Sequence, residues 1–157
     1  MSYDFSADEI FEMAGQLERN GAAFYRKAAE GIGDDAGKAM LTRLAAMEDD
    51  HEKTFAAMRK ELAAGEKAAT VFDPEGDSVA YLKALVDTRV FFEKEIDTSS
   101  MKEILKAAIE AEKDSIVFYL GMKEAVPEKL GKDRLDGVIK EEMGHIRLLS
   151  KELVALK

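Results

Sequence analysis

The two histidines of this chain each follow a glutamate by three residues. His51 follows Glu48, and His145 follows Glu142. Positions i and i+3 lie on one face of a helix, so a carboxylate and an imidazole spaced in this way can bind one metal ion together. A further glutamate lies 30 residues before each pair, at Glu18 and Glu112. This spacing predicts a helical hairpin in which a single glutamate faces each Glu-x-x-His segment.

All six of these residues fall within predicted apolar stripes of helices. Four carboxylates buried without partners would be strongly destabilising, because each ion loses its hydration. Two divalent cations would neutralise the four carboxylates. One glutamate from each of two helices and Glu-x-x-His from each of two others is the ligand set of di-iron and di-manganese carboxylate bundles. The sequence therefore predicts a site for two metals, the alternative being a core of satisfied polar pairs or a vestigial site. The predicted ligands are Glu18, Glu48, His51, Glu112, Glu142 and His145.

Apolar side chains that recur at helical spacing predict the elements that hold these residues. Ser6 and Ser100 each precede a glutamate by three residues, which is the capping-box pattern of a helix start. Pro74 breaks any helix between residues 65 and 78, and Pro127 ends the third long helix. The expected long helices span residues 6–31, 34–65, 100–126 and 129–157, and a shorter helix spans residues 79–92.

The predicted fold is a single all-α domain over residues 1–157, built from two repeated helical hairpins. The first hairpin covers residues 6–64, the crossover with the short helix 65–98, and the second hairpin 99–157. A four-helix bundle with one long crossover is the arrangement of ferritin-like folds. A shift of 94 residues aligns 9–63 with 103–157 without gaps and gives 13 identical pairs in 55 positions, as expected for two hairpins of common ancestry.

Composition excludes several classes of function. With 23 basic and 32 acidic residues the net charge is −9, which disfavours binding to nucleic acid and to anionic membranes. The absence of cysteine excludes disulfides, cysteine-ligated zinc, iron–sulfur clusters and thiol catalysis. The sequence has no apolar run long enough for a transmembrane helix. Its first residues lack the pattern of a signal peptide, so the expected location is the cytoplasm.

The ligand motifs resemble those of the rubrerythrin branch of the ferritin-like superfamily. The similar stretches are residues 18–25, 48–51, 112–119 and 142–145, and the resemblance extends over nearly the whole chain. It implies a non-haem di-iron protein that reduces hydrogen peroxide or dioxygen, or one that oxidises ferrous iron. It also implies that Glu48 and Glu142 bridge the two metals. The remaining ligands implied by the resemblance are Glu18 with His51 and Glu112 with His145.

The sequence departs from the rubrerythrin pattern in two ways. Full-length rubrerythrins carry a rubredoxin domain with four cysteines, whereas this chain has none, so electrons are expected from an external donor such as a rubredoxin. The usual second glutamate of the third long helix is replaced by Ser115. A site of six ligands resembles bacterioferritin-like ferroxidase centres equally well, which leaves a ferroxidase or iron-handling protein as the alternative function.

The expected cofactor is a pair of iron ions, Fe²⁺ when reduced and oxo-bridged Fe³⁺ when oxidised. Affinity alone also admits manganese or zinc. The expected substrate is hydrogen peroxide or dioxygen, and the expected assembly is a homodimer.

Several residues near the predicted ligands can be interpreted either as part of the site or as ordinary packing. Tyr25 and Tyr119 lie seven residues after Glu18 and Glu112, and their hydroxyls either hydrogen-bond the bridging carboxylates or belong to satisfied core aromatics. Gly21 either leaves room for peroxide or allows close packing of helices. Two equivalent polar residues, Asn20 and Asp114, are candidates to orient a histidine ring. The remaining acidic residues around the site are expected on a solvated face; they are Asp49, Asp50, Glu52, Glu110 and Glu141.

Overall fold

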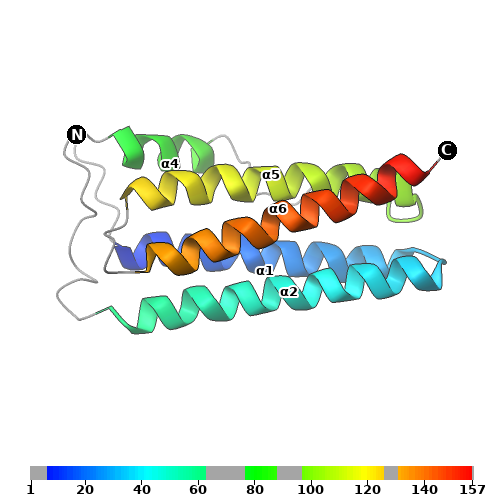
Figure 1. The fold of residues 1–157 in the computed structure, drawn as a ribbon, viewed down its shortest axis with the longest axis horizontal. Helices are drawn as coiled ribbons and strands as arrows, with labels where there is room; N and C mark the ends of the chain where they lie inside the picture. Colours follow the sequence, from blue (N-terminus) through cyan, green and yellow to red (C-terminus); the bar gives the residue numbers. More distant parts are fainter. Residues whose placement is uncertain (1–6, 63–76, 88–96, 126–130, 157) are drawn as a thin grey trace.

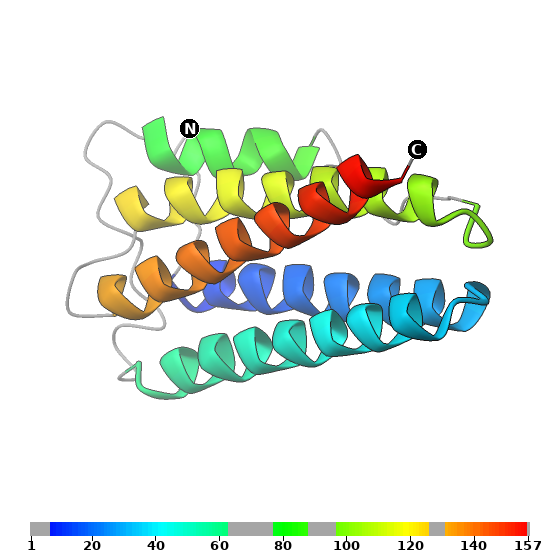
Figure 2. The ribbon, with the colours of Figure 1, turned by 45° about the vertical axis from the view of Figure 1, so that its right-hand side comes forward.

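The computed structural model describes residues 7–62, 77–87, 97–125 and 131–156, which form five helices and no strand. The helices are α1 (Ala7–Gly31), α2 (Asp35–Lys60), α4 (Asp77–Asp87), α5 (Met101–Ala125) and α6 (Lys132–Ala155). The four long helices form a bundle, as Figures 1 and 2 show, which confirms the predicted all-α four-helix bundle. None of the described helices is long and apolar enough to span a membrane.

Two hairpins, α1 with α2 and α5 with α6, pack side by side in the bundle. The short helix α4 lies against α5, on the side away from α2 (Figure 2). Gly121 on α5 permits this approach, because a Cβ at this position would overlap the ring of Tyr81 on α4. The hydroxyl of Tyr81 donates a 2.8 Å hydrogen bond to the carbonyl oxygen of Val117. The crossover helix therefore braces the hairpin that carries half of the predicted ligands.

Polar caps fix where several helices begin. The Asp34 carboxylate accepts a 2.9 Å hydrogen bond from the backbone N–H of Gly37 at the start of α2. Ser100 Oγ accepts one of 3.3 Å from the backbone N–H of Glu103, as its capping pattern predicts. Gly131 has a φ of 102°, in the left-handed region, and α6 starts directly after it at Lys132. Ser6, Pro127 and the predicted start at 129 lie outside the described residues.

Two predicted helix boundaries were wrong. The second helix ends at Lys60 and not near residue 65, because the backbone N–H of Leu62 bonds to the Arg59 carbonyl in a tighter turn that closes the helix. The short helix starts at Asp77, two residues before its predicted start, with an acidic side chain in its first turn where the helix dipole favours it. The last predicted residues of this helix, 88–92, lie outside the described part.

The core of the bundle consists of two apolar clusters separated by a polar layer. One cluster occupies the end where α1 begins and α2 ends, and it includes Phe11, Leu17, Phe55, Met58 and Phe118. The other lies around the turn from α1 to α2 and includes Ile32, Leu41, Leu44, Ile104 and Leu149. In each of the four long helices, the buried polar residues lie between members of these two clusters along the sequence. The apolar ends therefore hold the polar layer away from water.

Candidate metal centre

All six predicted ligands meet in this polar layer, each with no more than 4% of its surface exposed. They form two overlapping groups in which the possible donor atoms all lie within 4.8 Å of one another. The first half-site consists of Glu18, Glu48, His51 and Glu142. The second half-site consists of Glu48, Glu112, Glu142 and His145. Helices α1 and α5 each contribute one glutamate, and α2 and α6 each contribute a Glu-x-x-His segment.

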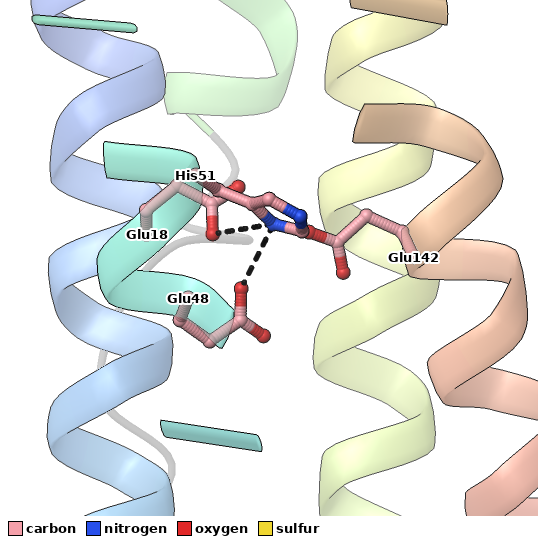
Figure 3. A group of neighbouring side chains, drawn as sticks. All are labelled: Glu18, Glu48, His51 and Glu142. Atoms are coloured by element: carbon pink, nitrogen blue, oxygen red, sulfur yellow. Dashed lines mark hydrogen bonds and ion pairs between the residues drawn. The ribbon is translucent and has the colours of Figure 1, made fainter. Parts of the chain in front are cut away.

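The first half-site is arranged around Nδ1 of His51 (Figure 3). This nitrogen lies 2.9 Å from Oε1 of Glu142 and 3.4 Å from Oε2 of Glu18. Oε2 of Glu48, one helical turn away on α2, lies at 3.6 Å. Three carboxylates from three helices therefore converge on one imidazole nitrogen.

The second half-site repeats this arrangement around Nδ1 of His145. Oε1 of Glu112 lies at 3.2 Å, Oε2 of Glu142 at 3.3 Å and Oε1 of Glu48 at 3.8 Å. The two imidazole rings are nearly parallel, with centroids 5.8 Å apart. Glu48 and Glu142 thus each direct one oxygen towards each histidine. That is the geometry expected of carboxylates that bridge two metals.

Two buried tyrosines bond the unshared carboxylates, Glu18 and Glu112, which each belong to one half-site only. The Tyr25 hydroxyl, on α1, donates a 2.6 Å hydrogen bond to Oε1 of Glu112 on α5. The Tyr119 hydroxyl, on α5, donates to Oε1 of Glu18 on α1. The sequence left two interpretations open, a bond to a bridging carboxylate or a core aromatic with a satisfied hydroxyl; each tyrosine instead bonds the glutamate of the opposite hairpin that belongs to one half-site only. The bonds cross because each tyrosine lies on a long helix that faces the other.

Gly21 lies against the carboxylate of Glu48. A Cβ added at Gly21 would meet the Cδ, Cγ and Oε1 atoms of Glu48 at 3.4–3.5 Å. These are ordinary van der Waals distances, so a methyl group would fit beside the Glu48 carboxylate and close packing does not require a glycine here.

A family model described as Rubrerythrin matches residues 9–153 of the chain. The chain belongs to the rubrerythrin family. Its fold is similar to that of a protein from Thermotoga maritima described as a candidate ferritin-like diiron-carboxylate protein, with 22% identity and a TM-score of 0.71. That alignment covers 98% of this chain and 97% of the other. No curated protein matches the chain in sequence.

In this rubrerythrin-family site, four buried carboxylates face only two buried histidines. Burial, together with the neighbouring carboxylate of Glu112, raises the pKa of Glu142 to about 8. Burial and contact with Glu18 raise the pKa of Glu48 well above its ordinary value. Burial acts to raise the pKa of Glu112 as well, but contacts with Glu142 and His145 lower it to about 2. Burial also raises the pKa of Glu18. Three of the four carboxylates therefore bind a proton more readily than an ordinary glutamate when no other cation neutralises them.

Both histidines favour the charged form for the same reason. Burial acts to lower the pKa of His145, but its contacts with Glu112 and Glu142 outweigh burial and raise the pKa to about 10. The pKa of His51 is also raised, because contacts with Glu142 and Glu18 outweigh burial. Protons on the histidines thus partly balance the carboxylates in the metal-free protein.

Three buried polar atoms among the described residues lack a hydrogen-bond partner, and two of them face the half-sites where a metal would bind. Within the described part of the chain, Oε2 of Glu18, Oε2 of Glu142 and Nε2 of His145 form no hydrogen bond. The two glutamate oxygens point into the half-sites, towards the Nδ1 atoms of the histidines. Unsatisfied buried acceptors are costly, and a divalent cation would satisfy them. Carboxylate oxygens with one imidazole nitrogen per half-site suit iron or manganese and also admit zinc.

The sequence predicted Glu141 on a solvated face, and its carboxylate is more than half exposed. The sequence did not predict that its Oε2 lies 2.5 Å from Nε2 of His51, at the outer edge of the centre. Sequence equivalence pointed to Asn20 and Asp114 for the role of orienting a histidine. A signal was present in the repeat, because Glu141 aligns with the apolar Met47 and so breaks the pattern of the first hairpin.

A cleft of about 400 Å³ between α2 and α6 leads from the surface to this contact. Its lining comes from both helices and is formed by Met47, Asp50, His51, Thr54, Arg134, Gly137, Val138 and Glu141. The cleft therefore reaches His51, and none of the other five predicted ligands lines it.

Proposed function

We propose that this chain binds two iron ions in its two half-sites and uses them to reduce hydrogen peroxide, with electrons from a separate donor such as a rubredoxin. The observation that carries the proposal is that Glu48 and Glu142 each direct one oxygen towards each histidine. Two metals held by shared carboxylates can act together on one small oxidant. Membership of the rubrerythrin family supports the same reading.

Each ligand has a distinct role in this proposal. Glu18 and His51 hold one metal, and Glu112 and His145 hold the other. The two shared glutamates, which are Glu48 and Glu142, bridge the pair. Four carboxylates and two divalent cations balance in charge, so loading removes the cost of the buried negative charges.

When bound, two ferrous ions supply one electron each, and with two protons these electrons convert one hydrogen peroxide into two waters. The tyrosines keep the unshared carboxylates in place during this change of charge. Burial, together with the negative charge of Glu112, raises the pKa of Tyr25 well above its ordinary value, so its hydroxyl remains a donor. Burial and Glu18 have the same effect on Tyr119. The apolar clusters on either side exclude bulk water, and the cleft at His51 admits small molecules.

The proposal is tested by loading the metal-free protein with two equivalents of Fe²⁺ without oxygen, then mixing it rapidly with peroxide or with dioxygen. We expect oxidation by peroxide to be much faster than oxidation by dioxygen, and much faster than that of free Fe²⁺. A matched variant is E48Q, which removes one charged bridge and should abolish fast two-electron oxidation. A rate with peroxide no faster than that of free Fe²⁺ would exclude a peroxidase.

A ferroxidase or iron-handling protein is the second candidate. The observation that favours it is Ser115, which lies one turn after Glu112 on α5, where rubrerythrins usually carry a further glutamate. In this case dioxygen would oxidise the iron faster than peroxide does. Repeated additions of Fe²⁺ distinguish turnover from storage, because a carrier saturates at two ions per chain.

A further inference from the structure

The two half-sites differ in what holds the outer nitrogen of their histidine. Each imidazole directs Nδ1 towards the carboxylates, so Nε2 is the outer nitrogen. Nε2 of His51 lies 2.5 Å from Oε2 of Glu141. Nε2 of His145 is buried and, among the described residues, has no hydrogen-bond partner. The tyrosine contacts, in contrast, are the same in the two half-sites, since each half-site has one unshared glutamate bonded by a tyrosine.

The internal repeat accounts for this difference. The shift of 94 residues that aligns His51 with His145 also aligns Met47 with Glu141. A thioether sulfur is only a weak acceptor, whereas a carboxylate accepts strongly from an imidazole N–H. The second hairpin thus provides a carboxylate at the position where the first hairpin provides an apolar side chain.

A carboxylate on the outer nitrogen changes how a histidine binds metal. It holds the proton on Nε2, so that when a metal displaces the proton on Nδ1 the lone pair there is directed at the metal, and it makes that lone pair more basic. The ring of His51 is therefore prepared for a metal at Nδ1. Nε2 of His145 has no such partner among the described residues, so no carboxylate holds its proton when the metal arrives.

We propose that Glu141 is a positioning residue that makes the first half-site bind its metal more tightly than the second, so that the two metals load in a fixed order. The first metal binds at Glu18 and His51, and the second at Glu112 and His145. This inference rests on the metal site of the proposed function, but it does not depend on the reaction with peroxide.

Titration of the full-length, metal-free protein with Co²⁺, a redox-stable probe, tests the order. Calorimetry and visible absorption of the wild type should resolve two steps of different affinity. E141M gives α6 the residue that α2 has at the equivalent position, and it should weaken the tighter step about 10- to 100-fold, as loss of such a partner typically does. E141Q, which keeps an acceptor but no charge, should lie between the two.

The matched control is E152M, which removes an exposed carboxylate elsewhere on α6. Its two binding steps should equal those of the wild type. If E141M and E152M titrate alike, or if the wild type binds two equal equivalents, the proposal for Glu141 is wrong. If no Co²⁺ binds at all, the metal centre and with it the proposed function are wrong, so the two failures are distinguishable.

A second readout assigns the order to particular residues. The chain has two histidines, so the side-chain ¹⁵N spectrum of the Zn²⁺-titrated protein contains two imidazoles, which H145Q assigns. At one equivalent of Zn²⁺, the Nδ1 signal of His51 should shift fully while that of His145 stays near its metal-free position. In E141M both signals should shift together. A shift of His145 before His51 in the wild type would overturn the proposed order.

Discussion

The hydroxyl of Tyr25 on α1 donates a 2.6 Å hydrogen bond to Oε1 of Glu112 on α5, so a residue of the first hairpin holds a ligand of the second. Tyr119 holds Glu18 in the reverse direction. Neither bond can form until the two hairpins are docked. Docking of the hairpins and orientation of the unshared ligands are therefore the same event.

Tyr25→Phe should destabilise the metal-free protein by about 1.5–3 kcal/mol, because it removes a hydrogen bond to a buried charged carboxylate and leaves the acceptor without this donor. Urea denaturation of the metal-free protein measures the loss. Tyr81→Phe is the matched control, since the Tyr81 hydroxyl bonds a backbone carbonyl at the surface. The control should change the free energy of unfolding by less than about 0.5 kcal/mol. Equal losses in the two variants would contradict a special role for the Tyr25 bond.

The stability of the metal-free protein should fall as pH rises from about 5 to about 8. The folded-state pKa of Glu142 is raised by burial from 4.5 to about 8, so the native state keeps a proton in this window that the unfolded chain has released. The raised pKa of His145, about 10 against 6.5, extends the fall to higher pH. Denaturation midpoints measured across this range give the slope.

E142Q is the control for this slope, since its amide does not titrate, and its stability should fall less between pH 5 and pH 8. Bound Zn²⁺ should reverse the trend, because the metal displaces protons and binds more tightly as pH rises. If the free energy of unfolding of the metal-free wild type instead increases over this window, the pKa of Glu142 is not raised in the folded state and the prediction is wrong.

The shared and unshared glutamates should differ in how many metals they control. Glu48 faces both histidines, so Glu48→Gln should weaken both equivalents of bound Co²⁺. Glu18 contacts His51 alone of the two histidines, so Glu18→Gln should weaken one equivalent and leave the other in place. Metal content after gel filtration gives the count. Loss of a single equivalent in both variants would contradict bridging by Glu48.

The sequence predicted the polar layer because the ligands obey simple helical geometry. Glu48 and His51 are one turn apart, and such a pair shares a face whatever surrounds it. Burial of the six residues followed from their place within apolar stripes. The prediction of two hairpins rested on the apolar stripes and the breaks between them, and the repeat, which preserves spacing within each hairpin, supported it. The order of α1, α2, α5 and α6 agrees with this prediction.

Contacts between hairpins could not be predicted in the same way. The pairing of Tyr25 with Glu112 depends on which long helices face each other, and spacing along one helix does not specify that. The contact of Glu141 with His51 was not predicted because the residue is exposed, as expected, while its long side chain reaches across to α2. The end of α2 was missed because local hydrogen bonds at Leu62, and not a glycine or proline, close that helix.

The cleft between α2 and α6 should control the rate of metal loading. Gly137 lies in its lining, and a Cβ at this position meets no atom within 4 Å, so a larger side chain can extend into the opening without disturbing the core. Gly137→Leu should therefore slow Co²⁺ uptake in stopped-flow absorbance while leaving the equilibrium affinities unchanged.

Gly144→Leu provides the matched control for this variant. Gly144 is also on α6 and also has open space at its Cβ, but it is not part of the cleft lining. Both substitutions replace a helical glycine and should stabilise α6 by a similar amount, about 0.5–1 kcal/mol, so any difference in uptake rate reflects the cleft. If the two variants take up Co²⁺ equally fast, metal enters by another route. A slower uptake in Gly137→Leu alone would identify the cleft that ends at His51 as the entrance, which is also the side on which the first half-site is proposed to fill.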